Sequence, residues 1–232
     1  MASATEARPA LAEAIGTFAL VLAGTGAIVV NDASGGALGH AGVALTFGLV
    51  VMVMICALGD VSGAHLNPAV TLAFVVARRF PAARAPAYVA AQLAGAVAAS
   101  GVLALLFPQH PTLGATLPAG PAWQSCVLEF LLSCLLMLVI LRVSAGASEV
   151  GLLAGAAIGA TVGMEALFAG PVSGASMNPA RSLAPALVSG ATRDLWVYLL
   201  APALGACAAV PLCRTLSPRG CCDGSCAPQP VR

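Results

Sequence analysis

Long apolar runs, interrupted by short polar breaks, make up most of this chain. A helix needs about 20 apolar residues to cross roughly 30 Å of hydrocarbon, and several runs reach that length. The pattern therefore predicts an all-α membrane protein. The expected spans are residues 10–31, 40–59, 85–107, 122–143, 150–168 and 194–215.

Two shorter apolar stretches, 67–78 and 178–189, are each about half as long as a span. Both begin with Asn-Pro, and Asn before a first-turn Pro is a good helix start. They are expected to be half-helices that enter the membrane without crossing it. Non-helical backbone at that depth is tolerated only inside protein or beside a water-filled cavity, so the segments leading into them should lie in such a place.

The two halves of the chain repeat each other. Residues 61–73 read VSGAHLNPAVTLA and residues 172–184 read VSGASMNPARSLA, while Glu13 in the first expected span is matched by Glu129 in the fourth. Each half holds an odd number of spans, so the halves should have inverted topology, with a solute site near the bilayer midplane. The expected divisions are 1–9, an N-terminal cytoplasmic segment; 10–109 and 110–215, the inverted repeats; and 216–232, a disordered tail.

Composition and motifs argue against a soluble domain, a nucleic-acid-binding protein and an enzyme. Hydrophobic residues are 59% of the chain and charged residues only 8%, with a mean hydropathy of +0.96, which suits a lipid-facing surface rather than a soluble domain. The net charge of +1 and the absence of a basic patch give no reason to expect nucleic acid. No Ser-His-Asp set, metal-ligand spacing or phosphate loop indicates an enzyme or a cofactor.

The arginines orient the predicted spans. Eight of the ten basic residues fall on the side of both termini, which by the positive-inside rule is the cytoplasm. The expected location is therefore the cell membrane, with both termini cytoplasmic. These eight are Arg8, Arg78, Arg79, Arg84, Arg142, Arg214, Arg219 and Arg232.

Two Asn-Pro-Ala boxes, 67–69 and 178–180, each follow Ser-Gly-Ala at matching repeat positions. This arrangement resembles the aquaporin, or major intrinsic protein, family over nearly the whole chain. The segment LFAGPVSGASMNPARSLAPALVSG resembles sequences of the nodulin-like intrinsic proteins of plants and their bacterial relatives. The resemblance implies six spans and two re-entrant half-helices, a passive channel for small neutral solutes and water in a lipid bilayer, and a homotetramer with a pore in each subunit.

The boxes give the expected pore signature. Asn67 and Asn178 would each cap a half-helix and offer an amide donor to the pore. A water that accepts from both amides turns its hydrogens outward, and the positive helix ends oppose cations, which is the established logic of aquaporin-type pores. The alternative is that the asparagines only cap helices. The signature residues are Asn67, Pro68, Ala69, Asn178, Pro179 and Ala180.

The family resemblance also assigns a constriction, consisting of Phe47, Ala166, Ala175 and Arg181. Water-selective members have a histidine where this chain has Ala166, and glycerol facilitators of the enteric type have two aromatic residues and an Asp where this chain has Ser182. One ring, two alanines and an arginine predict a wide opening that passes glycerol-like polyols and arsenite as well as water. The alternatives are a strictly water-selective channel, a coupled secondary transporter, and a scaffold that has lost conduction.

Other ionisable residues in the apolar runs need a role of their own. By resemblance, Glu13 and Glu129 support the loops before the boxes, with a proton relay as the alternative. Glu165 faces either the pore mouth or a neighbouring helix or subunit, where it would need a buried partner. His65 serves either packing or gating by protonation.

The remaining candidates are two histidines and the cysteines at the C-terminal end. His40 and His110 are expected in loops, without a role. Cys221, Cys222 and Cys226 lie in a Pro-, Gly- and Ser-rich tail, and three thiols so close together could bind arsenite, zinc or copper. Lipidation and an unselected tail are the alternatives; elsewhere no metal site is expected.

Overall fold

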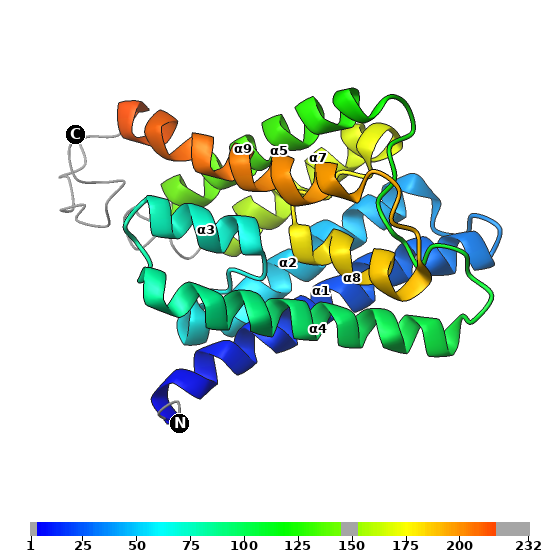
Figure 1. The fold of residues 1–232 in the computed structure, drawn as a ribbon, viewed down its shortest axis with the longest axis horizontal. Helices are drawn as coiled ribbons and strands as arrows, with labels where there is room; N and C mark the ends of the chain where they lie inside the picture. The colour runs from blue at the N-terminus through cyan, green and yellow to red at the C-terminus, as the bar shows by residue number, and fades with distance from the viewer. Residues whose placement is uncertain (1–3, 145–152, 217–232) are drawn as a thin grey trace.

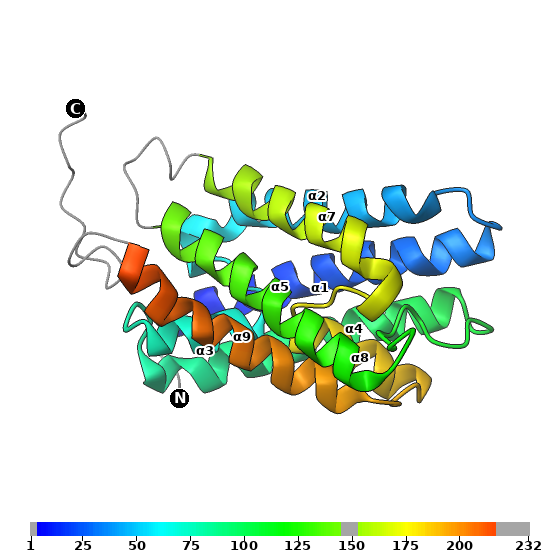
Figure 2. The same cartoon turned by 90° about the horizontal axis from the view of Figure 1, so that it is seen from above.

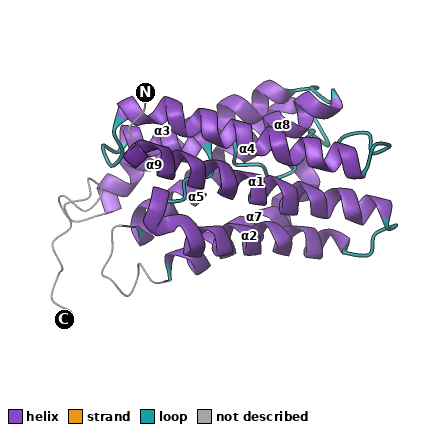
Figure 3. Cartoon of the chain, turned by 90° about the horizontal axis from the view of Figure 1, so that it is seen from below, coloured by secondary structure: helices purple, strands orange, loops and turns teal. Residues whose placement is uncertain are grey.

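The computed structural model describes residues 4–144 and 153–216, with side chains from residue 7 onward. These residues contain no strand, and six of their helices are long and apolar enough to cross a membrane (Figures 1 and 3). The predicted all-α membrane fold is thereby confirmed. The long helices are α1 (Ala4–Ala33), α2 (Gly39–Ser62), α4 (Ala85–Leu106), α5 (Ala122–Val143), α7 (Ala154–Ser173) and α9 (Leu195–Leu216).

Two short helices, α3 (Pro68–Val76) and α8 (Pro179–Ser189), pack against both α4 and α9. Figure 1 shows that they start near the middle of the molecule and run toward opposite ends. Each begins at the proline of an Asn-Pro pair, where the missing N–H costs nothing because a first-turn amide has no helical acceptor. The half-helices therefore form where the sequence places them.

The ends of two long helices differ from the sequence prediction. Helix α1 already begins at Ala4, within the segment 1–9. Helix α7 continues to Ser173 instead of ending at residue 168, and Gly174 ends it with a φ of +85°. Pro171 lies inside its last turns and has no N–H, so the carbonyl of Leu167 one turn earlier loses its helical donor.

The freed carbonyl of Leu167 has a partner from another helix. The ring Nε2 of His40 lies 2.7 Å from this oxygen, at hydrogen-bonding distance. His40 is in the first turn of α2, so the expectation of a loop histidine without a role is wrong. It links the start of α2 to the end of α7, and the sequence could not show this because the two residues are 127 positions apart.

Glycines let the helices of each half approach backbone to backbone. A Cβ on Gly95 of α4 would collide with the carbonyl of Ala14 on α1, and a Cβ on Gly205 of α9 would collide with the carbonyl of Phe130 on α5. Small residues at such crossings replace the hydrophobic driving force that lipid does not supply. These two contacts lie one residue beyond Glu13 and Glu129, so they also set the depth of both carboxylates.

The half-helices bind the two halves together. Helix α3, from the first half of the chain, packs against α9, and α8 packs against α4. The start of α1 and the end of α9 lie at the same end of the bundle (Figures 1 and 2). At that end Arg79 donates to the carbonyls of Leu141 (3.0 Å) and Ser144 (2.9 Å), which joins the turn after α3 to the end of α5.

Gly95→Ala should lower the melting temperature, since the added methyl group meets the backbone of α1 rather than a movable side chain. The cost of such overpacking is about 1–3 kcal/mol. Gly101→Ala is the matched control: it lies on the same helix with no atom within 4 Å of the added Cβ, so it should be neutral or slightly stabilising. Thermal unfolding in detergent, followed by circular dichroism, compares the two, and equal melting temperatures would contradict the close crossing.

Candidate functional site

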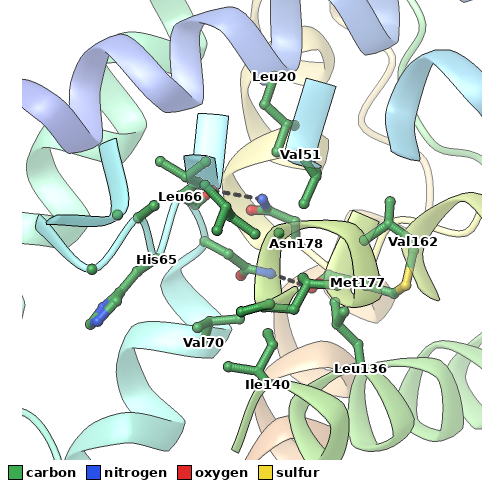
Figure 4. A pocket seen from close by; sticks show the side chains of 18 of the residues that line it. Leu20, Val51, His65, Leu66, Val70, Leu136, Ile140, Val162, Met177 and Asn178 are labelled. Carbon is green, nitrogen blue, oxygen red and sulfur yellow. Dashed lines mark hydrogen bonds between the residues drawn. The ribbon is translucent and has the colours of Figure 1, made fainter. Parts of the chain in front are cut away.

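The two asparagines of the boxes meet across the centre of the bundle. Nδ2 of Asn67 donates to the carbonyl of Met177 (2.7 Å), and Nδ2 of Asn178 donates to the carbonyl of Leu66 (2.9 Å). Figure 4 shows Asn178 directed toward Leu66, with both hydrogen bonds drawn. Each asparagine thus bonds the loop that leads into the other half-helix, so the two helix starts are held face to face.

The same side chains cap their own helices. Oδ1 of Asn67 accepts from the N–H of Ala69 (2.8 Å), and Oδ1 of Asn178 accepts from that of Ala180 (3.0 Å). An amide nitrogen carries two hydrogens, and only one from each asparagine has an acceptor among the described residues. Both asparagines line a cavity of about 680 Å³. Two donors, each at the positive end of a half-helix, are therefore available to a solute there.

The loops before the two boxes share an alternating backbone. Positive φ angles occur at Ala64 (45°) and Leu66 (53°), and again at Ala175 (40°) and Met177 (54°). Alternation of left- and right-handed residues turns successive N–H groups to one side, forming a concavity that binds an anion. The other side of each loop lines the large cavity.

A buried carboxylate fills each concavity. Glu13 accepts from the N–H groups of His65 (2.9 Å) and Leu66 (2.7 Å), and also from the side chains of Ser62 (2.7 Å) and Gln92 (2.8 Å). The neighbouring N–H groups of one loop are thus satisfied by one side chain. Their alternating conformation, which costs free energy at every non-glycine residue with positive φ, is compensated by these four bonds.

Glu129 repeats this arrangement in the second half. It accepts from the N–H groups of Ser176 and Met177 and from the hydroxyl of Ser173, each at 2.8 Å. Position 202, which matches Gln92, is a proline, so the fourth donor is missing. With all these donors aimed at their oxygens, both glutamates are placed for loop support.

The four residues of the expected constriction lie at the meeting of two cavities. Phe47 and Arg181 line both the large cavity and a second one of about 320 Å³, while Ala175 lines the first and Ala166 the second. The guanidinium carbon of Arg181 is 5.0 Å from the centroid of the Phe47 ring. Gly24 on α1 leaves the room that this ring fills, because a Cβ there would collide with it.

Arg181 is held from an unexpected direction. It is only 2% exposed, and its NH1 group donates to the carbonyl of Gly114 (2.9 Å), in the loop between α4 and α5. Sequence reasoning missed Gly114, as it missed the carbonyls of Leu66 and Met177. Backbone acceptors leave no mark in a sequence, because any residue type supplies one.

His65 lies in an aromatic cluster at one end of the large cavity. Its ring centroid is 4.7 Å from that of Phe74, 4.9 Å from that of Phe80 and 5.2 Å from that of Tyr88. Its Nδ1 is 3.1 Å from the hydroxyl of Thr71. These contacts favour the packing role, although the residue also lines the cavity.

Glu165 is fully buried and lines neither cavity. It therefore faces its neighbours in the bundle rather than the pore mouth. The expected buried partner is missing, since neither carboxyl oxygen has a hydrogen bond to any residue in the ranges 7–144 and 153–216. The cysteines of the tail lie outside the described residues, and within these residues no three His, Cys, Asp or Glu side chains gather as metal ligands would.

Comparisons with known proteins cover the site as well as the fold. A family model described as major intrinsic protein matches residues 1–212. Aquaporin NIP1-1 of Oryza sativa subsp. japonica is 51% identical over 199 residues, 85% of this chain and 70% of the rice protein. Nodulin-26 of Glycine max is 47% identical over 199 residues, 85% and 73% of the two chains. The X-ray structure of the aquaglyceroporin from Plasmodium falciparum matches with a TM-score of 0.81 and 25% identity, covering 89% of this chain and 95% of that one.

Glu129→Ala should lower both the melting temperature and the solute flux. It leaves the two loop N–H groups and the Ser173 hydroxyl without an acceptor, at about 1–3 kcal/mol for each buried group. Glu129→Gln should have a smaller effect, because one amide oxygen remains to accept. Asp194→Asn, at a partly exposed carboxylate, is the control and should match the wild type. A Glu129→Ala protein with unchanged melting and flux would show that the carboxylate does not hold the loop.

Proposed function

The chain belongs to the major intrinsic protein family, whose members are channels and not enzymes, and we propose that its pore passes glycerol-like polyols and neutral metalloid hydroxides such as arsenite. It is a multi-pass membrane channel for water and small uncharged solutes. Channel membership also argues against the coupled transporter and the scaffold. The proposal concerns the width of the pore and the residues that set it.

One observation carries the proposal: the constriction is lined by only one bulky ring. Ala166 and Ala175 each contribute a single methyl group next to Phe47 and Arg181. A strictly water-selective pore would need a larger side chain at one of the alanine positions. The likeness to an aquaglyceroporin over most of both chains supports a pore wide enough for polyols.

Polar groups along the pore match a solute that carries hydroxyls. Arg181 has N–H groups beyond the one bonded to Gly114, and these can donate to a hydroxyl oxygen while the charge opposes cations. The free N–H groups of Asn67 and Asn178 offer two further donors at the centre. Carbonyls on the cavity side of the two loops can accept the hydroxyl hydrogens, so a polyol exchanges its water shell for fixed partners.

The same centre opposes proton passage, by the logic established for aquaporin-type pores. A water that accepts from both asparagine amides has its hydrogens directed away from the centre, which interrupts a hydrogen-bonded proton wire. The positive N-terminal ends of α3 and α8 both lie at this point and raise the energy of a cation. We assign Glu13 and Glu129 to supporting the loops that hold this geometry.

The assembly and orientation follow the same reasoning. We propose that 10–109 and 110–215 are inverted repeats, that four copies assemble with a pore in each, and that both termini face the cytoplasm. The basic residues support this orientation, since Arg8, Arg142 and Arg214 belong to α1, α5 and α9 at or near the end where α1 begins and α9 ends. The cell membrane is the proposed location.

Ala166→His should reduce glycerol and arsenite entry by about tenfold while leaving water flux within about twofold, because it fills one side of the constriction and adds a polar contact. Stopped-flow light scattering of proteoliposomes under water, glycerol and arsenite gradients measures all three. Ala166→Ser, which is close to alanine in size, is the control and should keep solute entry. A wild-type protein that passes water but neither solute would defeat the wide-pore proposal.

A C-terminal reporter tests the orientation. A fluorescent protein that matures in the cytoplasm should be bright when fused after Arg232, whereas a periplasm-dependent phosphatase at the same position should be inactive. A fusion within the exposed turn between α1 and α2, at Gly35, should give the opposite pair of results. An active phosphatase at the C-terminus would reverse the proposed topology.

A further inference from the structure

The loop between α4 and α5, residues 107–121, carries the carbonyl that holds Arg181. In Figure 1 this loop crosses the end of the bundle where α1 ends. In this loop the carbonyl of Gly114 accepts from Arg181, while the buried Nε of Arg181 has no partner among the described residues. The position of the guanidinium therefore depends on the Phe47 ring and on where the loop places one oxygen.

The turn that presents this oxygen is strained. Leu113 has a φ of +51° and Gly114 a φ of +75°, so two consecutive residues are left-handed. A left-handed leucine is unfavourable and persists only where its surroundings enforce it. Gly114 is also pressed against Thr25 of α1, where a Cβ would come within 2.8 Å of the threonine side chain. The residues that precede Gly114 therefore need a contact outside the turn to hold its conformation.

The ring of His110 supplies that support. Its Nδ1 accepts from the N–H of Leu113 (3.0 Å) and, more weakly, from that of Thr112 (3.4 Å). Because Nδ1 accepts, the ring proton is on Nε2, which lies 3.2 Å from a carboxylate oxygen of Asp32 near the end of α1. The His110 side chain is 8% exposed, so the ring is buried, while the side chain of Asp32 is 55% exposed.

We propose that His110 is a positioning residue that determines specificity: it ties the Leu113–Gly114 turn to Asp32 and thereby fixes Arg181 in the constriction. The inference rests on the proposed function, in which Arg181 forms part of the constriction. Beyond Gly114 the loop has other attachments, since Thr116 donates to Ser182 (2.8 Å). Before Gly114 the His110 ring links the turn to Asp32 of α1, so each side of the turn has a polar attachment of its own.

The test compares glycerol-to-water permeability ratios in proteoliposomes, which do not depend on how much protein is folded. Arg181→Ala is the reference variant, and the sign of its change in the glycerol-to-water ratio defines the expected direction for the other variants. His110→Ala should shift the ratio in the same direction, by about twofold or more. The double variant should shift it no further than Arg181→Ala alone, because residues acting through one contact are not additive. Gln109→Ala, an exposed neighbour in the same loop, should leave the ratio unchanged.

Two further variants separate positioning from folding. His110→Asn keeps an acceptor that can reach backbone N–H groups two or three residues on. Its shift in the permeability ratio should therefore be at most half of the shift in His110→Ala. Asp32→Ala removes only the partner of Nε2 and should cause a smaller shift in the same direction. If His110→Ala does not fold, Asp32→Ala decides: a shift in the direction of Arg181→Ala supports the inference, and an unchanged ratio overturns it.

The outcomes for the inference and for the proposed function are distinct. If Arg181→Ala shifts the ratio while His110→Ala does not, the role of His110 is wrong and the constriction stands. If the shifts of the double variant add in full, His110 acts elsewhere, which also overturns the inference. If Arg181→Ala leaves the ratio unchanged, the constriction assignment fails and the inference fails with it.

Discussion

The rest of the structure depends on two carboxylates, Glu13 and Glu129, each buried against the backbone of a loop. A loop inside a membrane must have its N–H groups satisfied, because no bulk water is present to do so. Each glutamate accepts from two consecutive N–H groups and so stabilises an alternating backbone that would otherwise be unfavourable. With the donors of each loop directed at a carboxylate, its other side is left for the cavity.

The depth of these carboxylates is in turn fixed by helix packing. Gly95 and Gly205 allow α1 and α5 to approach their partners at the residue that follows each glutamate. Tyr88 of α4 donates to the carbonyl of Ser62 at the end of α2 (2.9 Å), and Tyr198 of α9 donates to that of Ser173 at the end of α7 (2.7 Å). Close backbone contacts and buried hydrogen bonds thus stabilise the helix packing, as hydrophobic burial does in a soluble protein.

The halves depart from symmetry at the proposed constriction. Thr71 in the first half bonds the ring of His65, and the matching Ser182 in the second half bonds Ser176 at the equivalent position, but Ser182 also accepts from Thr116 of the long loop. The second box is followed by Arg181 and the first by Val70, so only one half needs an acceptor for a guanidinium. The loop 107–121 meets this need with the Gly114 carbonyl, which gives the constriction a polar side and leaves the opposite half apolar.

Sequence alone determined the spans, the half-helices and the pairing of Asn67 with Asn178, because length, Asn-Pro starts and an internal repeat are local patterns. It also named Phe47, Ala166, Ala175 and Arg181, through family resemblance. Only the tertiary structure decided which groups hold them. The partners are backbone carbonyls and distant side chains: Met177 lies 110 residues from Asn67, and Gly114 lies 67 from Arg181. Every residue carries a carbonyl, so only the fold specifies which one is used.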